Sequence, residues 1–382
     1  MKILLIGEYS GLHNTLKHGL VHHGHEVTLI GTGDGFKNYP VDHDHKSRFF
    51  SRPAIRPFVK IIERLTGINL IQVEHGVRFK RLLPLLSDYD IVQLINEHSI
   101  RTRPSTEIKL LKQLIQQNRS LFLLSCGTDY TSVKFAHDGK LRYSILTPYL
   151  NDPGIKANYR FILRYLTAPY KRLHDFLYDN VSGIIASDLD YHIPLKGQPN
   201  YLGMVPNPIN LNKLQYKSPS INKGITIFHG VNTMNYVKKG NHFFDEALDI
   251  IKRKYGEKVI IIRSENKPYK EYIRAYDQAH ILLDQVYAYD QGFNALEAMA
   301  KGKVVFTGAE QEWLDYYQLE KDTVAINALP DTEYLVNKLS WLIEHPEKIK
   351  EISLNARAFM EREHDYKNCA KQYLDKWLNA MD

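Results

Sequence analysis

Residues 290–308 read DQGFNALEAMAKGKVVFTG and place one carboxylate, Glu297, inside a short apolar helix. The turn at Gly292, Phe293 and Asn294 opens this helix, and we expect Asn294 to be its N-cap. The free amides and partial positive charge of a helix N-terminus suit a phosphate. One turn further, a carboxylate can accept hydrogen bonds from both hydroxyls of a ribose. The structural alternative is a capping box, in which Glu297 bonds back to Asn294.

Two further glycine turns follow strand-like segments and could contact phosphates. In HGVNTMNYVKKG (229–240), Gly230 ends a strand, and Lys238 and Lys239 precede a helix, where an ammonium could neutralise a diphosphate. The alternative is that both lysines are solvated. In GEYSGLHNTLKHGL (7–20), Gly11 opens a helix whose amides could meet a phosphate, or forms a plain tight turn. The GxxxG spacing differs from GxGxxG, which makes a dehydrogenase the least favoured reading.

Strand-like and helix-like segments alternate along the chain, as in parallel sheets with helices on both faces. Residues 205–224, rich in Pro, Asn and Ser, separate two such series as a linker does. We therefore predict an α/β protein with two Rossmann-like doubly wound domains facing a central cleft. The N-terminal domain is expected at 1–208 and the C-terminal domain at 209–360. A C-terminal helix at 361–382 is a candidate to pack back on the N-terminal domain. Helices are expected at 12–23, 105–117, 160–178, 241–255 and 269–278.

Composition excludes several classes of protein. The chain has 382 residues, of which 43% are hydrophobic and 24% charged, which fits neither disorder nor membrane spans. Its first apolar run, residues 1–7, is too short for a signal peptide. The two cysteines form neither a disulfide framework nor a metal spacing and suit a reducing cytoplasm. The DxD sequences at 42–44 and 188–190 and the histidines at 22, 23 and 25 lack supporting context, so no metal site is expected.

The net charge of +7 arises in the N-terminal half, where residues 1–208 carry 26 Lys and Arg against 18 Asp and Glu. Within 45–65, basic residues interleave with aromatic rings, which suits contact with an anionic membrane surface. The alternative is a solvated basic helix, and no nucleic-acid motif is present. The residues concerned are Lys46, Arg48, Arg52, Arg56 and Lys60, with Phe49, Phe50 and Phe58.

The segment GFNALEAMAKGKVVFTG (292–308), the upstream KKG (238–240) and VPNP (205–208) together resemble the retaining nucleotide-sugar glycosyltransferases of family 4. These enzymes have the GT-B architecture of two facing Rossmann-like domains. The resemblance extends to GHEVTLI (24–30) and to the C-terminal segment 347–378, so it covers nearly the whole chain. LEAMAKGKVV is its most specific part.

The resemblance implies a role for several residues. Glu297 matches the glutamate that holds the donor ribose, and Lys239 matches the lysine that holds the donor diphosphate. Gly11 matches a glycine near the same phosphates. The predicted donor-binding residues are Gly11, Gly230, Lys238, Lys239, Asp290, Gly292, Phe293, Asn294 and Glu297, and the catalytic candidates are Asp129, Lys239 and Glu297.

The sequence departs from the family at three places. Tyr289 stands where the family has its first glutamate, and Asp290 is the candidate replacement. The loop after Gly230 lacks the family's phosphate arginine, for which Lys238 or His229 is the candidate substitute.

The third departure is a missing histidine after the strand at 121–125. Asp129 is the polar candidate there for contact with the sugar or acceptor, with a helix cap as the alternative.

The function implied is metal-independent glycosyl transfer, with retention, from a nucleoside diphosphate sugar to a saccharide or lipid-linked acceptor. We expect no cofactor, no nucleic-acid partner and a cytoplasmic location, with the inner face of the plasma membrane as a candidate peripheral site. Surface polysaccharide or glycolipid synthesis is the expected context. The alternatives are a GT-B sugar-nucleotide epimerase and a non-catalytic GT-B binding subunit.

Overall fold

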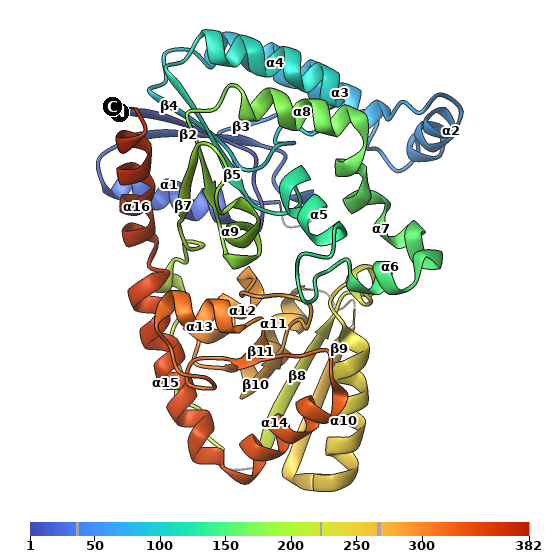
Figure 1. The fold of residues 1–382 in the computed structure, drawn as a ribbon, viewed down its shortest axis with the longest axis vertical. Coiled ribbons are helices and arrows are strands. Elements are labelled where there is room, and N and C mark those ends of the chain that lie inside the picture. Colours follow the sequence, from blue (N-terminus) through green and yellow to red (C-terminus); the bar gives the residue numbers. More distant parts are fainter. Residues whose placement is uncertain (36–37, 222–223, 266–268, 382) are drawn as a thin grey trace. The chain divides into compact units, whose positions relative to one another are not determined.

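The computed structural model describes residues 1–35, 38–221, 224–265 and 269–381. The chain forms two compact units (Figure 1). Unit 1 contains Met1–Lys134, Phe161–Pro208 and the C-terminal segment from Tyr366, and unit 2 contains Phe135–Arg160 and Ile209–Asp365. The sequence predicts a single linker between the domains, at 205–224. The chain in fact passes between the units at further points, because residues 135–160 belong with unit 2.

The core of unit 1 is a parallel sheet with the order β3-β2-β1-β4-β5-β6-β7. Its central strand β1 is a buried apolar run, in which Leu4 lies between Thr28 of β2 and Val92 of β4. Strands buried on both faces require such continuous hydrophobic runs. The strands are β1 (Lys2–Ile6), β2 (Glu26–Gly31), β3 (His43–Asp44), β4 (Ile91–Leu94), β5 (Ser120–Ser125), β6 (Gly183–Ala186) and β7 (Tyr201–Met204).

Helices α1 and α4 fall where the sequence predicts them, at 12–23 and 105–117, but the expected helix at 160–178 is broken. Helix α7 ends at Leu163, Thr167 is extended, and α8 starts at Ala168 with Pro169 in its first turn. A proline lacks an amide donor and is favoured in the first turn of a helix, so Pro169 fits a new helix start better than a helix interior. The helices are α1 (Leu12–His22), α2 (Arg56–Thr66), α3 (Leu70–Leu82), α4 (Pro104–Gln116), α5 (Tyr130–His137), α7 (Lys156–Leu163), α8 (Ala168–Tyr178) and α9 (Leu189–Leu195); α5 and α7 each cross the division between the units.

The C-terminal helix α16 (Tyr366–Asn379) packs against α1 in unit 1 and is joined to it by buried hydrogen bonds. Trp377 Nε1 donates to Gln93 Oε1 at 3.1 Å, and Gln93 Nε2 donates to His13 Nε2 at 3.2 Å. His13 Nδ1 then donates to the carbonyl of Gly7 at 2.8 Å. Burial lowers the pKa of His13 to about 3, against the opposing hydrogen bond to Gly7. This network therefore requires a neutral imidazole.

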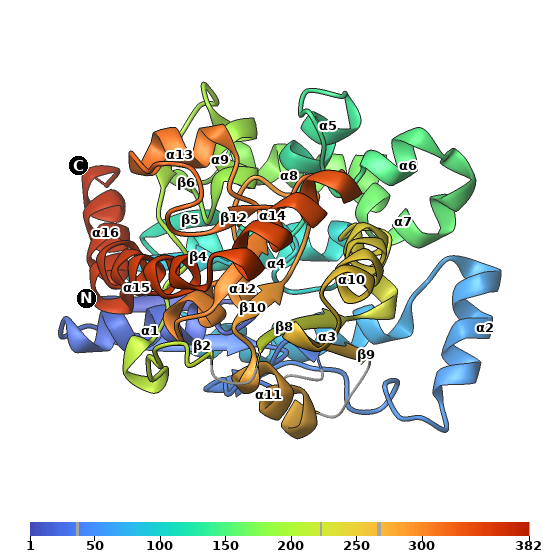
Figure 2. The ribbon, with the colours of Figure 1, turned by 90° about the horizontal axis from the view of Figure 1, so that it is seen from below.

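Unit 2 contains a second parallel sheet with the order β12-β11-β10-β8-β9. Figure 2 shows α10 and α14 on one face of this sheet and α11 on the other. The sequence prediction of two parallel α/β sheets is confirmed. The strands are β8 (Ile225–Val231), β9 (Val259–Glu265), β10 (Ile281–Leu283), β11 (Val304–Thr307) and β12 (Ile326–Asn327). The helices are α6 (Thr147–Asn151), α10 (Asn241–Tyr255), α11 (Tyr269–Gln278), α12 (Phe293–Ala300), α13 (Gln311–Tyr317), α14 (Thr332–Glu344) and α15 (Pro346–Glu363).

Among the described residues, no helix combines the length and the apolar character that a membrane crossing needs.

The buried neutral imidazole of His13 makes stability depend on pH. We expect the free energy of unfolding to fall as the pH drops below about 6.5, because the unfolded chain binds a proton there and the folded chain does not. His13 alone should contribute a loss of about 2 kcal/mol at about pH 5 relative to about pH 7. Urea unfolding at the two pH values measures this loss. In His13→Gln the drop should be smaller than in the wild type, and an equal drop would contradict the assignment.

Candidate functional site

Helix α12 begins after Gly292, which is its N-cap in an extended conformation. The carbonyl of Gly292 accepts the first helical hydrogen bond from Leu296 at 3.0 Å. The prediction that Asn294 is the N-cap is therefore wrong, because Asn294 lies inside the first turn. A capping box from Glu297 to Asn294 fails for the same reason. Within the described residues, no side chain accepts from the amides of Phe293 or Ala295, so the helix end keeps donors available.

The side chain of Asn294 binds Asp284 at the end of the neighbouring strand. Asn294 Nδ2 donates to Asp284 Oδ1 at 3.2 Å, and Lys239 Nζ donates to the same oxygen at 2.9 Å. The side chain of Asp284 is 2% exposed and that of Lys239 is 32% exposed. A buried carboxylate thus ties the ammonium of Lys239 to the first turn of α12.

Asp284 was not among the predicted site residues, because it lies within the strand-like segment at 280–286. It comes directly after β10, and a carboxylate at the carboxyl end of a buried parallel strand was the signal that could have identified it. Its second oxygen, Oδ2, is buried without a hydrogen-bond partner among the described residues. An unpaired buried acceptor is costly, so the cation of Lys239 stabilises this carboxylate.

The loop between β8 and α10 holds Lys239 in place. Gly240 follows Lys239 with φ of +67°, and a Cβ there would lie 2.9 Å from Cβ of Val286. The amide of Val286 in turn donates to the carbonyl of Lys239 at 2.9 Å. Glycine is therefore required by both backbone conformation and space, and the close approach brings Lys239 to the segment that follows β10.

Lys238 and His229 are engaged elsewhere. Lys238 Nζ lies 3.3 Å from the carbonyl oxygen of Met234 in its own loop, and burial lowers the pKa of Lys238. His229 is fully buried in β8, with its ring 5.4 Å from that of Phe244. Burial lowers the pKa of His229 to about 4, so the ring is neutral at neutral pH. The candidate substitution of His229 for a phosphate arginine therefore fails, because this ring is uncharged and out of reach of solvent.

Tyr289, at the position of the first glutamate, and its candidate replacement Asp290 are both buried. Tyr289 is 2% exposed, and its hydroxyl accepts from the amide of Arg142 at 2.9 Å. Asp290 is 5% exposed, and its Oδ1 accepts from the amide of Gln291 at 2.7 Å. The backbone of Asp290 also packs so closely on Gly308 that a Cβ at Gly308 would lie 2.5 Å from the Asp290 carbonyl. Asp290 thus shapes the turn that leads into α12.

Segment 135–160 is fixed to this turn by Arg142 and Tyr143. The guanidinium of Arg142 donates to Glu310 and to Glu312, with contacts of 2.7 Å, and lies 4.9 Å from the ring centre of Tyr289. The hydroxyl of Tyr143 also donates to Glu310. Paired charge-assisted hydrogen bonds of this kind are both strong and directional. Segment 135–160 is therefore part of the surroundings of α12.

In unit 1, the helix end at Gly11 is already occupied by a carboxylate. The amide of Gly11 donates to Glu8 Oε1 at 2.9 Å, and the amide of Asn14 donates to Glu8 Oε2 at 2.9 Å. Glu8 is 2% exposed, and burial raises its pKa to about 7 although three hydrogen bonds favour the charged form. The amides of Gly11 and Asn14 are therefore not free for a phosphate, because Glu8 takes the place that an anion would fill.

Asp129 serves as a helix cap, which was the alternative to a role with substrate. Its Oδ1 accepts from the amide of Ser132 at 2.7 Å in the first turn of α5, and its Oδ2 accepts from the hydroxyl of Ser125. Asp129 is 3% exposed. Both carboxylate oxygens therefore have a local structural function.

The structure brings only part of the predicted set together. Lys239 and Asn294 meet through Asp284, and Gly292, Phe293 and Glu297 belong to the same helix end. Gly230 lies in β8 opposite Ser264 of β9. Gly11 and Asp129 belong to unit 1 and are engaged within it.

The DxD sequence at 188–190 also forms a cap. Asp188 Oδ1 accepts from the amide of Asp190 at 3.1 Å at the start of α9. Within the described ranges, no group of three or more His, Cys, Asp or Glu side chains is arranged to hold a metal ion.

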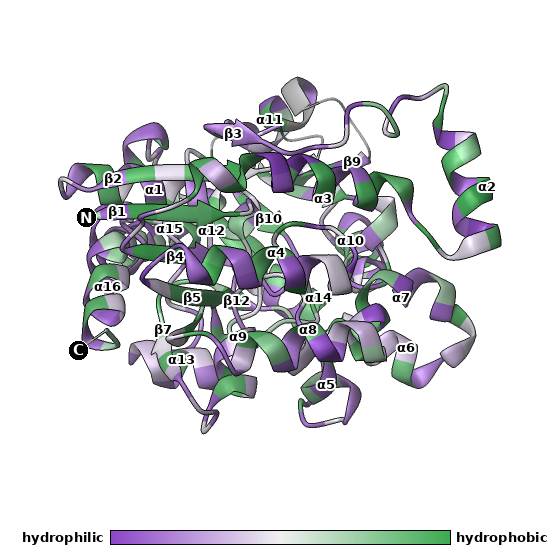
Figure 3. Cartoon of the chain, turned by 90° about the horizontal axis from the view of Figure 1, so that it is seen from above, coloured by the Kyte–Doolittle hydropathy of each residue, from purple (hydrophilic) through white to green (hydrophobic). Residues whose placement is uncertain are grey.

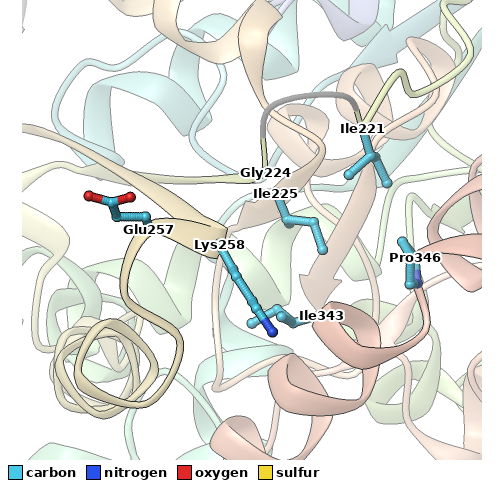
Figure 4. Close-up of a pocket in the computed structure, with 7 residues that line it drawn as sticks. All are labelled: Ile221, Gly224, Ile225, Glu257, Lys258, Ile343 and Pro346. Atoms are coloured by element: carbon cyan, nitrogen blue, oxygen red, sulfur yellow. The ribbon is translucent and has the colours of Figure 1, made fainter.

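A shallow hollow of about 390 Å³ in unit 2 lies at the other end of the sheet, near the amino ends of β8 and β9 (Figure 4). The side chain of Lys258 runs toward Ile343, whereas the carboxylate of Glu257 points away from the apolar lining. The hollow is separate from α12, since Lys239 and Asp284 follow the carboxyl ends of their strands. Its lining residues are Ile221, Gly224, Ile225, Glu257, Lys258, Ile343 and Pro346.

Residues 239–375 match a family model described as glycosyl transferase-like. The matched range starts at Lys239 and includes Asp284, Asn294 and Glu297. A search of curated protein sequences finds no match.

Several solved structures are similar over essentially the whole chain. The HepE protein of Anabaena, in complex with UDP and glucose, has a TM-score of 0.60 at 14% identity, over 99% of this chain and 100% of that one. Sucrose-phosphate synthase of Thermosynechococcus elongatus has a TM-score of 0.58 at 14% identity, over 100% of both chains. The N-terminal domain of Candida albicans trehalose-6-phosphate phosphatase has a TM-score of 0.61 at 10% identity, over 99% and 96%. At such identities the likeness shows the fold alone, and this chain has the GT-B fold.

Proposed function

We propose that this protein transfers a sugar from a nucleoside diphosphate sugar to a hydroxyl acceptor, with retention of the anomeric configuration. The observation that carries the proposal is the contact of Lys239 and Asn294 with buried Asp284, at a helix end that keeps free amides and is followed by Glu297. The glycosyl transferase-like match covers all four residues. The complex of HepE with UDP and glucose supports a nucleotide-sugar donor.

Unit 2 is proposed to hold the donor by its nucleotide. Glu297 would accept hydrogen bonds from the two ribose hydroxyls, which are neighbouring donors that one carboxylate can satisfy. The diphosphate would accept hydrogen bonds from the amides of Phe293 and Ala295 and from the ammonium of Lys239. Asp284 keeps that ammonium beside the helix, because its buried oxygen binds both Lys239 and Asn294.

In the transfer, the bond between the anomeric carbon and the diphosphate oxygen breaks, and a bond to the acceptor oxygen forms on the same face of the sugar. The departing phosphate oxygen takes the proton of the acceptor hydroxyl. Fixed dipoles and the Lys239 ammonium would stabilise the charge that develops on the diphosphate, in the place of a metal ion. Gly11 and Asp129 are left out of this scheme, since their polar groups bind Glu8 and the start of α5.

The acceptor is proposed to be a saccharide or lipid-linked precursor of a surface polysaccharide or glycolipid, bound by unit 1. The charge distribution supports this choice, because the basic excess lies in residues 1–208. Such precursors carry phosphates or are presented at anionic membranes, and both favour a positively charged surface.

Glu297→Gln tests the nucleotide role, because the amide keeps the shape of the side chain but accepts at one oxygen only. Thermal shift with UDP, GDP, ADP and their sugars should reveal a stabilising nucleotide for the wild type. Its affinity should fall about tenfold or more in Glu297→Gln, with loss of transfer. The exposed Glu351→Gln on α15 is the matched control and should behave as the wild type.

An absence of stabilisation by any nucleoside diphosphate would contradict the donor site. Turnover of the sugar nucleotide without acceptor would instead indicate an epimerase. Binding without turnover across acceptors would indicate a binding subunit.

Asp284→Asn tests whether the buried carboxylate acts through Lys239. We expect about a tenfold loss of diphosphate affinity, because the ammonium loses its charged partner, and a similar or larger loss in Lys239→Met. The double variant should be no worse than Lys239→Met alone, since both changes act on one contact. Isothermal titration of the nucleoside diphosphate measures all three, and additive losses would show that Asp284 acts independently.

A further inference from the structure

Helix α2 exposes an apolar stripe that its own unit does not cover. Phe58, Ile61 and Leu65 are 57%, 56% and 79% exposed, and their spacing places them on one face of the helix. Val59 is the buried residue of α2. Single exposed apolar residues are ordinary, but three in one stripe mark an interaction surface. Figure 1 shows α2 at the outer side of unit 1, away from its sheet.

A basic stripe runs beside the apolar one. Arg56, Lys60 and Arg64 recur every fourth residue and are exposed, so they share a neighbouring face of the helix. Residues 46–66 contain six Lys or Arg and one Asp or Glu. Within the described part of the chain, Lys60 and Arg64 have no carboxylate partner. The hydropathy colouring of α2 shows both hydrophobic and hydrophilic residues on this helix (Figure 3).

The loop that leads into α2 is held rigidly and exposes one more ring. Glu74 of α3 accepts from the amides of Arg48, Phe49 and Phe50 at 2.8 to 3.0 Å. Burial opposes ionisation of Glu74, but these bonds and that from the Ser47 hydroxyl outweigh it and lower its pKa to about 2. The fixed loop leaves Phe49 50% exposed. Its exposure is therefore set by the fold.

We propose that α2 and the Phe49 loop form a docking surface for an anionic lipid bilayer, with Phe58, Ile61 and Leu65 inserted among the headgroups and acyl chains. The basic stripe favours an anionic bilayer as the partner of this surface. Anionic headgroups attract each Lys or Arg near the surface by about 1 kcal/mol, and the apolar stripe supplies hydrophobic insertion. A symmetric pairing of two copies through this face would oppose two positive stripes and is disfavoured.

The experiment is flotation of the full chain with vesicles of phosphatidylcholine alone or with added phosphatidylglycerol. We expect binding to the anionic vesicles, little binding to the neutral ones, and release at about 1 M salt, where the Debye length is about 3 Å. Phe58→Gln/Ile61→Gln/Leu65→Gln should abolish binding. Lys60→Gln/Arg64→Gln should weaken it about thirtyfold, from two contributions of about 1 kcal/mol each.

The matched control is Lys350→Gln/Leu354→Gln on α15, which removes an exposed lysine and a 60% exposed leucine from unit 2 and should bind as the wild type. Failure of the wild type to float with anionic vesicles would overturn the proposal, as would unchanged binding of the α2 variants. Concentration-dependent dimerisation that the triple variant abolishes would assign the stripe to a second copy and likewise overturn it. Thermal shift by nucleoside diphosphates should be the same in all variants, which separates this test from that of the proposed function.

Discussion

The candidate site depends on one buried carboxylate, that of Asp284. An anion buried to this degree persists only with a cation or several donors beside it, and Lys239 and Asn294 supply both to a single oxygen. The pairing joins two loops that follow different strands, β8 and β10. It also sets the direction of the Lys239 ammonium, which would otherwise move freely on a flexible stem. Thus a costly buried charge fixes the geometry of a positively charged helix end.

Much of the fold could be predicted because the spacing of apolar residues along the sequence indicates which side chains are buried. The helix at 241–255 was predicted to the residue, since its apolar spacing and the glycines on both sides mark it clearly. The broken helix at 160–178 shows the limit of the same method. There, the apolar pattern continues on both sides of Pro169, and a single helix was therefore predicted. Proline, however, favours a helix start rather than a helix interior.

Two misjudged details of the site concern the hydrogen-bond partners at helix N-termini. Asn294 had the right residue type for an N-cap, but the chain starts the helix two residues earlier and sends that side chain to Asp284. Glu8 lies three residues before Gly11, where the sequence showed only a glycine turn, yet its carboxylate caps α1. The contact of Asn294 with Asp284 depends on the distance between two loops, which the spacing of residues along one segment does not give. The placement of residues 135–160 in unit 2 has the same origin, since Arg142 and Glu310 are far apart in sequence.

The two units differ in whether the N-termini of their helices are free to bind an anion. In unit 1, Glu8 and Asp129 supply carboxylates to the first turns of α1 and α5, so those ends are neutralised from within. In unit 2, α12 begins at a glycine that has no side chain to offer, and Asp284, which binds Asn294 in the first turn, also binds the ammonium of Lys239. An anion therefore gains more at α12 than at either helix of unit 1. Much of the basic excess of residues 1–208 lies instead in residues 46–66, which include helix α2 and carry six Lys or Arg against one Asp or Glu, and it can attract an anionic surface over a distance.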